Sequence, residues 1–225
     1  LAHGFFHDIV LPRPAADASH TVLLLDDAAD AAATARALAA DGALVATIDA
    51  ARLRAAFARD GGACAFPDGD LENLSHWLQG YARLPDYRPP VLVGRGDGAA
   101  IVYAMAAQAG RGVFAGAITR GPLPPLALGK PPCKGAGTLF DGPAAARNAL
   151  RPVAALSTPW LALATPAQSP ALIAFARGIV DPYPGARLLG EGHGQQLQLA
   201  LVLQVLALLP ARLAAFGLTN QNLRR

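Results

Sequence analysis

The sequence predicts an α/β fold in which a mostly parallel sheet carries helices on both faces. Short apolar runs, such as TVLLL at 21–25, alternate along the chain with longer stretches of helical composition. Strands that are apolar throughout are typical of a parallel sheet buried on both faces. A glycine-rich turn at 94–98 joins one of these strands to a helix. No internal repeat or linker divides the 225 residues, so a single domain over 1–225 is expected.

The first elements are two strands separated by a helix. The strands are expected at 21–25 and 43–49, and the Ala-rich helix between them runs to about residue 40. Asp41-Gly42 ends that helix, because glycine suits the position that follows a helix C-terminus. The second strand is followed by an expected loop with glycines, a cysteine and a proline, namely Gly61, Gly62, Cys64 and Pro67.

An amphipathic helix is expected over 68–84. Asp68 or Asp70 would cap its N-terminus, because a carboxylate accepts hydrogen bonds from the first free backbone N–H groups. Apolar residues recur at helical spacing at Leu71, Leu74, Trp77, Leu78 and Tyr81.

The second half of the chain continues the alternation. A Pro- and Gly-rich stretch at 121–152 is expected to be irregular, with one short helix near 143–150. Strands are expected at 90–94, within 112–121, at 159–165 and at 186–191, and helices at 99–109, 170–178 and 195–216. Ligands of such sheets bind at the carboxyl ends of the strands, so the site is expected there.

Charge and composition exclude several classes of function. The net charge is only +3 and no block of Lys or Arg occurs, so nucleic-acid binding is not expected. The longest apolar run, 197–210, is interrupted by Gln204 and is shorter than the ~20 residues of a membrane-spanning helix. His3, His7 and His20 have no ligand spacing, so neither a metal site nor a cofactor is expected.

The two cysteines, Cys64 and Cys133, permit one disulfide or two buried thiols. A disulfide would add about 4 kcal/mol, because it closes a long loop in the unfolded chain. The chain starts at Leu1 without a methionine, so we expect a processed or shortened protein whose signal peptide is absent from this sequence.

The stretch VGRGDGAA has the form of a nucleophile elbow, G-x-nucleophile-x-G, with Gly96 in the nucleophile position. A generic glycine turn and a phosphate loop are the alternatives. The Lys-Ser/Thr pair of a P-loop and the third glycine of a dinucleotide fingerprint are both missing. The chain order supports the elbow: a strand end at 165–168 and then His193 follow it, as acid and histidine follow the nucleophile in hydrolases of this kind.

Several segments together resemble one family. They are FFHDIVLPRP near the start, CAFPDGDLENLSHWLQ, YRPPVLVG through the elbow, GVFAGAI, KPPCKGAG, PWLAL and GHG. In these segments the chain is similar to the VirJ/AcvB family of bacterial periplasmic, virulence-associated proteins, and the similarity runs from about Gly4 to Gly194. The resemblance implies an α/β-hydrolase-type fold, a paired Cys64 and Cys133, and a periplasmic location.

Three of the four catalytic elements of that family are altered here. Gly96 replaces the family's serine, and Gln168 stands at its acid position. The first-strand turn, a family S-G-D-G-G-W, reads LDDAADA here, whereas His193 matches the family histidine. Glycine has no side chain with which to form a covalent intermediate, and Gln168 cannot stabilise an imidazolium as a carboxylate does.

The expected function is therefore that of a catalytically degenerate, virulence-associated hydrolase-fold protein. It would bind a lipid or small-molecule ligand, or a protein partner in the cell envelope. The family's substrate class suggests an aminoacyl-phospholipid headgroup, whose ammonium Asp26, Asp27 and Asp97 would attract, with Arg95 also in the site. The alternative is an active esterase or lysyl-phosphatidylglycerol hydrolase that uses unusual chemistry around His193 and Asp97.

Overall fold

The computed structural model describes residues 1–12, 18–26, 31–121, 123, 125, 126, 128–133, 150–153, 156, 158–164, 170–180 and 186–190. The chain divides into two compact units, Leu1–Gly190 and Glu191–Arg225. Every described residue belongs to the first unit. The expected final helix at 195–216 lies outside the described residues, and the single domain over 1–225 stays a prediction.

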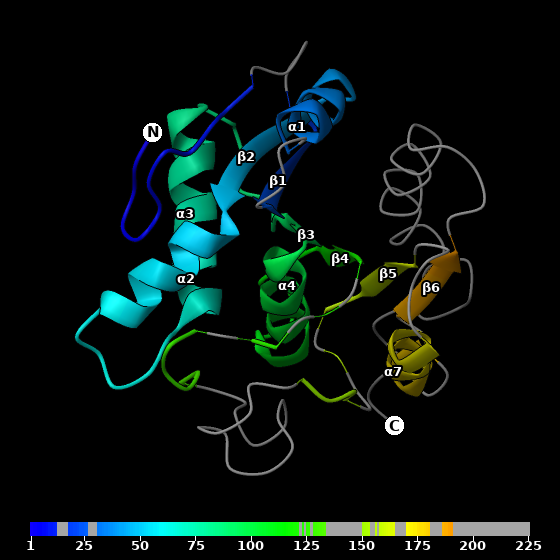
Figure 1. The fold of residues 1–225 in the computed structure, drawn as a ribbon. Helices are drawn as coiled ribbons and strands as arrows, with labels where there is room; N and C mark the ends of the chain where they lie inside the picture. Colours follow the sequence, from blue (N-terminus) through cyan, green and yellow to red (C-terminus); the bar gives the residue numbers. More distant parts are fainter. Residues whose placement is uncertain are drawn as a thin grey trace, which may run out of the picture. The chain divides into compact units, whose positions relative to one another are not determined.

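Six described strands form one parallel sheet (Figure 1). The strand order is β2-β1-β3-β4-β5-β6. This arrangement confirms the predicted α/β class with a mostly parallel sheet. The strands are β1 (His20–Asp26), β2 (Ala43–Asp49), β3 (Val91–Arg95), β4 (Gly116–Arg120), β5 (Trp160–Ala164) and β6 (Ala186–Gly190).

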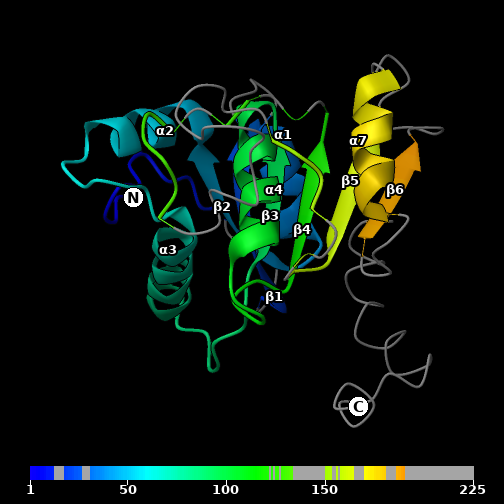
Figure 2. The same cartoon turned by 90° about the horizontal axis from the view of Figure 1, so that it is seen from below.

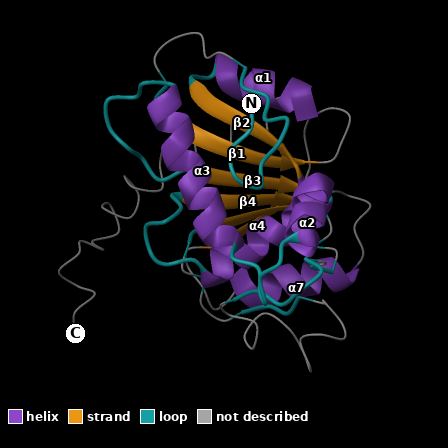
Figure 3. Ribbon diagram, turned by 90° about the vertical axis from the view of Figure 1, so that its left-hand side faces the viewer, coloured by secondary structure: helices purple, strands orange, loops and turns teal. Residues whose placement is uncertain are grey.

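The described helices are α1 (Ala31–Ala40), α2 (Ala50–Arg59), α3 (Pro67–Tyr81), α4 (Asp97–Gln108) and α7 (Pro170–Val180). The chain moves one way across the sheet from β1 to β2 and the opposite way from β2 onward. Since parallel crossovers are right-handed, α1 covers one face and the other described helices cover the opposite face. Figures 2 and 3 show α3 and α4 over one side of the strands.

Helix α4 lies at the centre of the core. Its residues from Gly98 to Ala106 are all buried, and they are mostly Gly, Ala and β-branched or aromatic residues. The central strand β1 is as deeply buried, with Leu23, Leu24 and Leu25 fully inaccessible. The small residues of α4 let its backbone approach the sheet closely, so the start of this helix is held firmly against β1 and β3. Within the described residues, no helix combines the length and the apolar composition needed to cross a bilayer.

Helix α2 was missed by the sequence analysis, which expected a loop directly after the second strand. Asp49 ends β2 and also caps α2, since its side chain accepts a hydrogen bond from the backbone N–H of Arg52 at 2.9 Å. Ala50, Leu53 and Phe57 are buried at helical spacing. That spacing was the available signal, and the charged residues between these positions obscured it.

The expected cap of α3 was also wrong. The helix begins at Pro67 with Phe66 in the cap position, so Asp68 and Asp70 lie inside its first turn. Proline is favoured at the first helical position because the N–H group it lacks has no partner there in any case. The apolar spacing was correct for Leu71, Leu74 and Leu78, all fully buried, whereas Tyr81 is 58% exposed.

Candidate functional site

The sharp turn between β3 and α4 is the centre of the candidate site. β3 ends at Arg95, α4 begins at Asp97, and Gly96 alone connects them. Gly96 has φ 52° and ψ −128°, a conformation that glycine adopts without strain and other residues rarely reach. The predicted strand–turn–helix is therefore present, with a residue that carries no side chain at its tip.

The two outer glycines of the motif are required by packing. A Cβ atom on Gly94 would lie 2.5 Å from the carbonyl oxygen of Gly98, inside the start of α4. A Cβ atom on Gly98 would lie 2.1 Å from the carbonyl oxygen of Leu25 in β1. Both distances are far below van der Waals contact, so any larger residue would separate α4 from the sheet.

The turn also lies where the strand order reverses. From β1 the chain crosses to β2 on one side, whereas β3 lies on the other side of β1. In open α/β sheets, ligands bind outside the carboxyl ends of the strands at this point. Asp26 at the end of β1 and Arg95 at the end of β3 are therefore placed at the expected binding edge.

Asp26 and Arg95 form an ion pair at this edge. Arg95 Nη1 lies 3.3 Å from Asp26 Oδ2, and the Asp26 side chain is completely inaccessible to solvent. The same nitrogen donates a hydrogen bond to Thr34 Oγ1 at 3.3 Å, from helix α1. The pair thus ties the ends of two neighbouring strands to a helix, which favours a structural role for the Asp26 carboxylate.

Asp97 pairs with a residue that the sequence analysis did not single out, Arg54 of α2. Arg54 Nη2 donates to Asp97 Oδ2, and both side chains are partly exposed, at 24% and 30%. Because α2 was not predicted from the sequence, Arg54 was not identified as a site residue. Only the packing of α2 against α4 brings the side chains of Arg54 and Asp97 together. No sequence pattern links positions 43 residues apart in this way.

The other predicted site residues lie outside the described residues. These are Asp27, Gln168 and His193, and their proposed roles stay predictions. Among the residues that the structure describes, no group of three His, Cys, Asp or Glu side chains is arranged to hold a metal ion.

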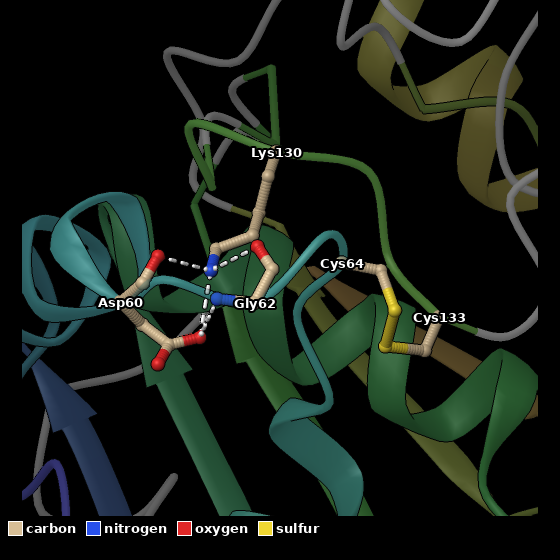
Figure 4. A network of polar contacts seen from close by, with 5 residues as sticks. All are labelled: Asp60, Gly62, Cys64, Lys130 and Cys133. Atoms are coloured by element: carbon tan, nitrogen blue, oxygen red, sulfur yellow. Dashed lines mark hydrogen bonds and ion pairs between the residues drawn. A yellow bond between two sulfur atoms is a disulfide. The ribbon is translucent and has the colours of Figure 1, made fainter.

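A disulfide and a polar clasp attach the segment that follows β4 to the loop between α2 and α3. Cys64 and Cys133 are joined, and Cys133 N donates to the Ala65 carbonyl oxygen at 2.8 Å. Lys130 Nζ donates to the Asp60 carboxylate at 2.8 Å, and to the backbone oxygens of Asp60 at 2.9 Å and Gly62 at 3.0 Å (Figure 4). The hydrogen bond from Lys130 lowers the pKa of Asp60.

Asp70, in the first turn of α3, has a carboxyl group whose pKa is strongly raised. Burial, reinforced by the negative charges of Asp60 and Asp68, raises its pKa to about 6. The folded state therefore keeps a proton on Asp70 at a pH where the unfolded chain has released it. This linkage stabilises the fold below pH 3.8, and the stabilisation is lost as the pH rises toward 6.

Asp70→Asn should consequently stabilise the protein at pH 7.5 and have little effect at pH 4. The full shift corresponds to about 3 kcal/mol, which the half-exposure of the side chain reduces to about 1 kcal/mol. Urea unfolding at the two pH values measures the difference. Asp86→Asn, at an exposed position after α3, is the matched control and should show no such gain at pH 7.5. An equal effect of Asp70→Asn at both pH values would contradict the linkage.

The solved structures that are similar to this chain include an esterase domain and a thioesterase. No family model matches the chain, and neither does any curated protein. The esterase domain of a Rhodothermus marinus protein superposes with a TM-score of 0.45 and 18% identity, over 90% of each chain. The type II thioesterase BorB from the borrelidin biosynthetic cluster gives a TM-score of 0.41 and 17% identity, over 100% of this chain and 98% of its own. Both scores are low, so the fold assignment rests on the topology of the sheet itself.

Proposed function

We propose that this chain is a catalytically degenerate α/β-hydrolase-fold protein of the VirJ/AcvB-like group. It binds a ligand, or a protein partner in the cell envelope, at the carboxyl edge of its sheet and does not turn over esters there. The observation that carries the proposal is the turn at Gly96, which keeps an elbow's geometry and has no side chain to attack a carbonyl carbon. A periplasmic location and an association with virulence are parts of the same proposal.

The charges of the described site bear on what it binds. Asp26 and Asp97, two of the three carboxylates expected to attract an ammonium group, each lie against a guanidinium group. Their negative charge is largely balanced, which weakens the case for a cationic headgroup. The same pairing weakens the alternative of an active hydrolase, because Asp97 would have to leave Arg54 to act as a base.

The test is hydrolysis of short p-nitrophenyl esters and of lysyl-phosphatidylglycerol by the parent, Gly96→Ser and Gly96→Ser/Gln168→Asp. We expect no turnover by the parent. We expect the double variant to hydrolyse the esters at least roughly tenfold faster than the background rate measured with the parent. That factor corresponds to about 1.4 kcal/mol of transition-state stabilisation. Serine in the backbone conformation of Gly96 costs about 1–3 kcal/mol, so each variant is first checked for cooperative unfolding.

His193→Ala in the parent background is the control. Parent turnover that this substitution abolishes would overturn the proposal and establish the alternative, an active enzyme working through His193. Turnover that it leaves unchanged would point to a contaminating esterase in the preparation.

A further inference from the structure

We propose that the edge beside Gly96 binds an oxyanion, a carboxylate or a phosphate, through the guanidinium group of Arg54. This inference rests on the proposed function, since it names the chemical class of ligand for the same edge of the sheet. The aspartates alone suggested a positively charged ligand, whereas this inference assigns a negatively charged one.

Helix α2 fixes where Arg54 can reach. The neighbouring residue Leu53 and the later Phe57 are buried at 2% and 1% exposure and anchor the helix in the core. The cap at Asp49 fixes its start. Arg54 is therefore held beside the first residue of α4, one position from the tip at Gly96, without being sealed from solvent.

The guanidinium of Arg54 has more donors than its partner uses. Nη2 donates to Asp97, whereas Nε is buried and has no hydrogen-bond partner among the described residues. A buried donor without an acceptor costs free energy. A carboxylate or phosphate presents two or three oxygens to the planar fork of an arginine and so satisfies more of its donors than one Asp97 oxygen does.

The surrounding charges favour an anion over a cation. Asp26 is inaccessible and held by Arg95, so it is not available to a ligand. Arg120, at the end of β4, lies opposite Arg95 in the sheet register and brings a third guanidinium group to this edge. The three described aspartates at the ends of β1 and β2 and at the start of α4, namely Asp26, Asp49 and Asp97, each lie against an arginine side chain, so none of them presents an unbalanced negative charge to a ligand. The positive end of α4 adds to the same field.

The experiment is a titration of the isotopically labelled protein with inorganic phosphate and, separately, with hexanoate at constant ionic strength. Chemical shifts of the backbone amides of Gly96 and Asp97 report binding. We expect saturable shifts in the parent, a dissociation constant raised roughly tenfold or more by Arg54→Gln, and one lowered roughly threefold by Asp97→Asn, which removes the competing carboxylate. Arg52→Gln is the matched control, because Arg52 lies on the same helix in exposed ion pairs with Asp8 and Asp49.

Saturation by phosphate alone, by hexanoate alone or by both identifies the source of the oxyanion and supports the site. The inference is overturned if neither probe saturates, if Arg52→Gln weakens binding as much as Arg54→Gln, or if Asp97→Asn weakens it. Ester hydrolysis is measured on the same samples. If the parent hydrolyses esters and still binds a probe through Arg54, the proposed loss of catalysis is wrong and the oxyanion site stands. If the parent is inactive and binds neither probe, the oxyanion site is wrong and the proposed loss of catalysis stands.

Discussion

Replacing Cys64 and Cys133 together by serine is expected to lower the free energy of unfolding by about 4 kcal/mol. The two residues are 69 positions apart, and the bond between them removes the conformational freedom of a loop of that length from the unfolded chain. Such a loss is a large fraction of the stability of an ordinary domain. Urea unfolding of the oxidised parent and of the double variant, at the same pH, measures it.

The native contacts around the disulfide should survive this substitution. The Lys130 clasp on Asp60 and Gly62, and the backbone bonds between Ala65 and the 131–133 segment, do not depend on the sulfur atoms. The variant should therefore still fold, and the parent treated with a phosphine reductant should match it. Ala63→Ser, an exposed substitution in the same loop, controls for the added hydroxyl. A loss below about 1 kcal/mol would show that the unfolded chain is already compact around this loop.

The sheet could be predicted from the sequence because its signal is local. β1 is buried on both faces, so the run from Val22 to Leu25 is apolar without alternation and needs no knowledge of its neighbours. The turn at 94–98 could be predicted as well, since close backbone contacts require glycine at both of its ends, Gly94 and Gly98. Helix α2 was harder, because its buried stripe is carried by three residues among arginines and alanines.

The electrostatics of the site could not be predicted, because they arise from pairs far apart in the chain. From the sequence, Asp26 and Asp97 are two carboxylates at strand and helix ends, and their negative charge is the natural inference. In the fold, Arg54 and Arg95 lie against them. The sign of the charge that the edge presents therefore depends on how α2 packs against α4, and only the three-dimensional arrangement supplies that information.

Gly98→Ala is expected to destabilise the protein by about 3 kcal/mol, the reverse of what helix propensity alone would give. In an ordinary helix, alanine is favoured over glycine by about 1 kcal/mol. Here the added Cβ atom would lie 2.1 Å from the Leu25 carbonyl oxygen and 2.7 Å from its carbonyl carbon. These are backbone atoms of a central strand, which cannot turn aside as a side chain can, so α4 must move away from β1.

Gly80→Ala provides the matched control, because Gly80 lies in the last turn of α3 with no atom within 4 Å of an added Cβ. That substitution should stabilise the protein by about 0.5–1 kcal/mol. Opposite signs for the two glycines, measured by urea unfolding, would establish that close packing against β1 sets the position of α4. Equal stabilisation would contradict this and would mean that the start of α4, and with it Asp97 and the Gly96 tip, is free to shift. The Gly98 variant should also show smaller oxyanion-induced shifts at Gly96 and Asp97, since a displaced α4 carries the amides of these two residues away from Arg54 of α2.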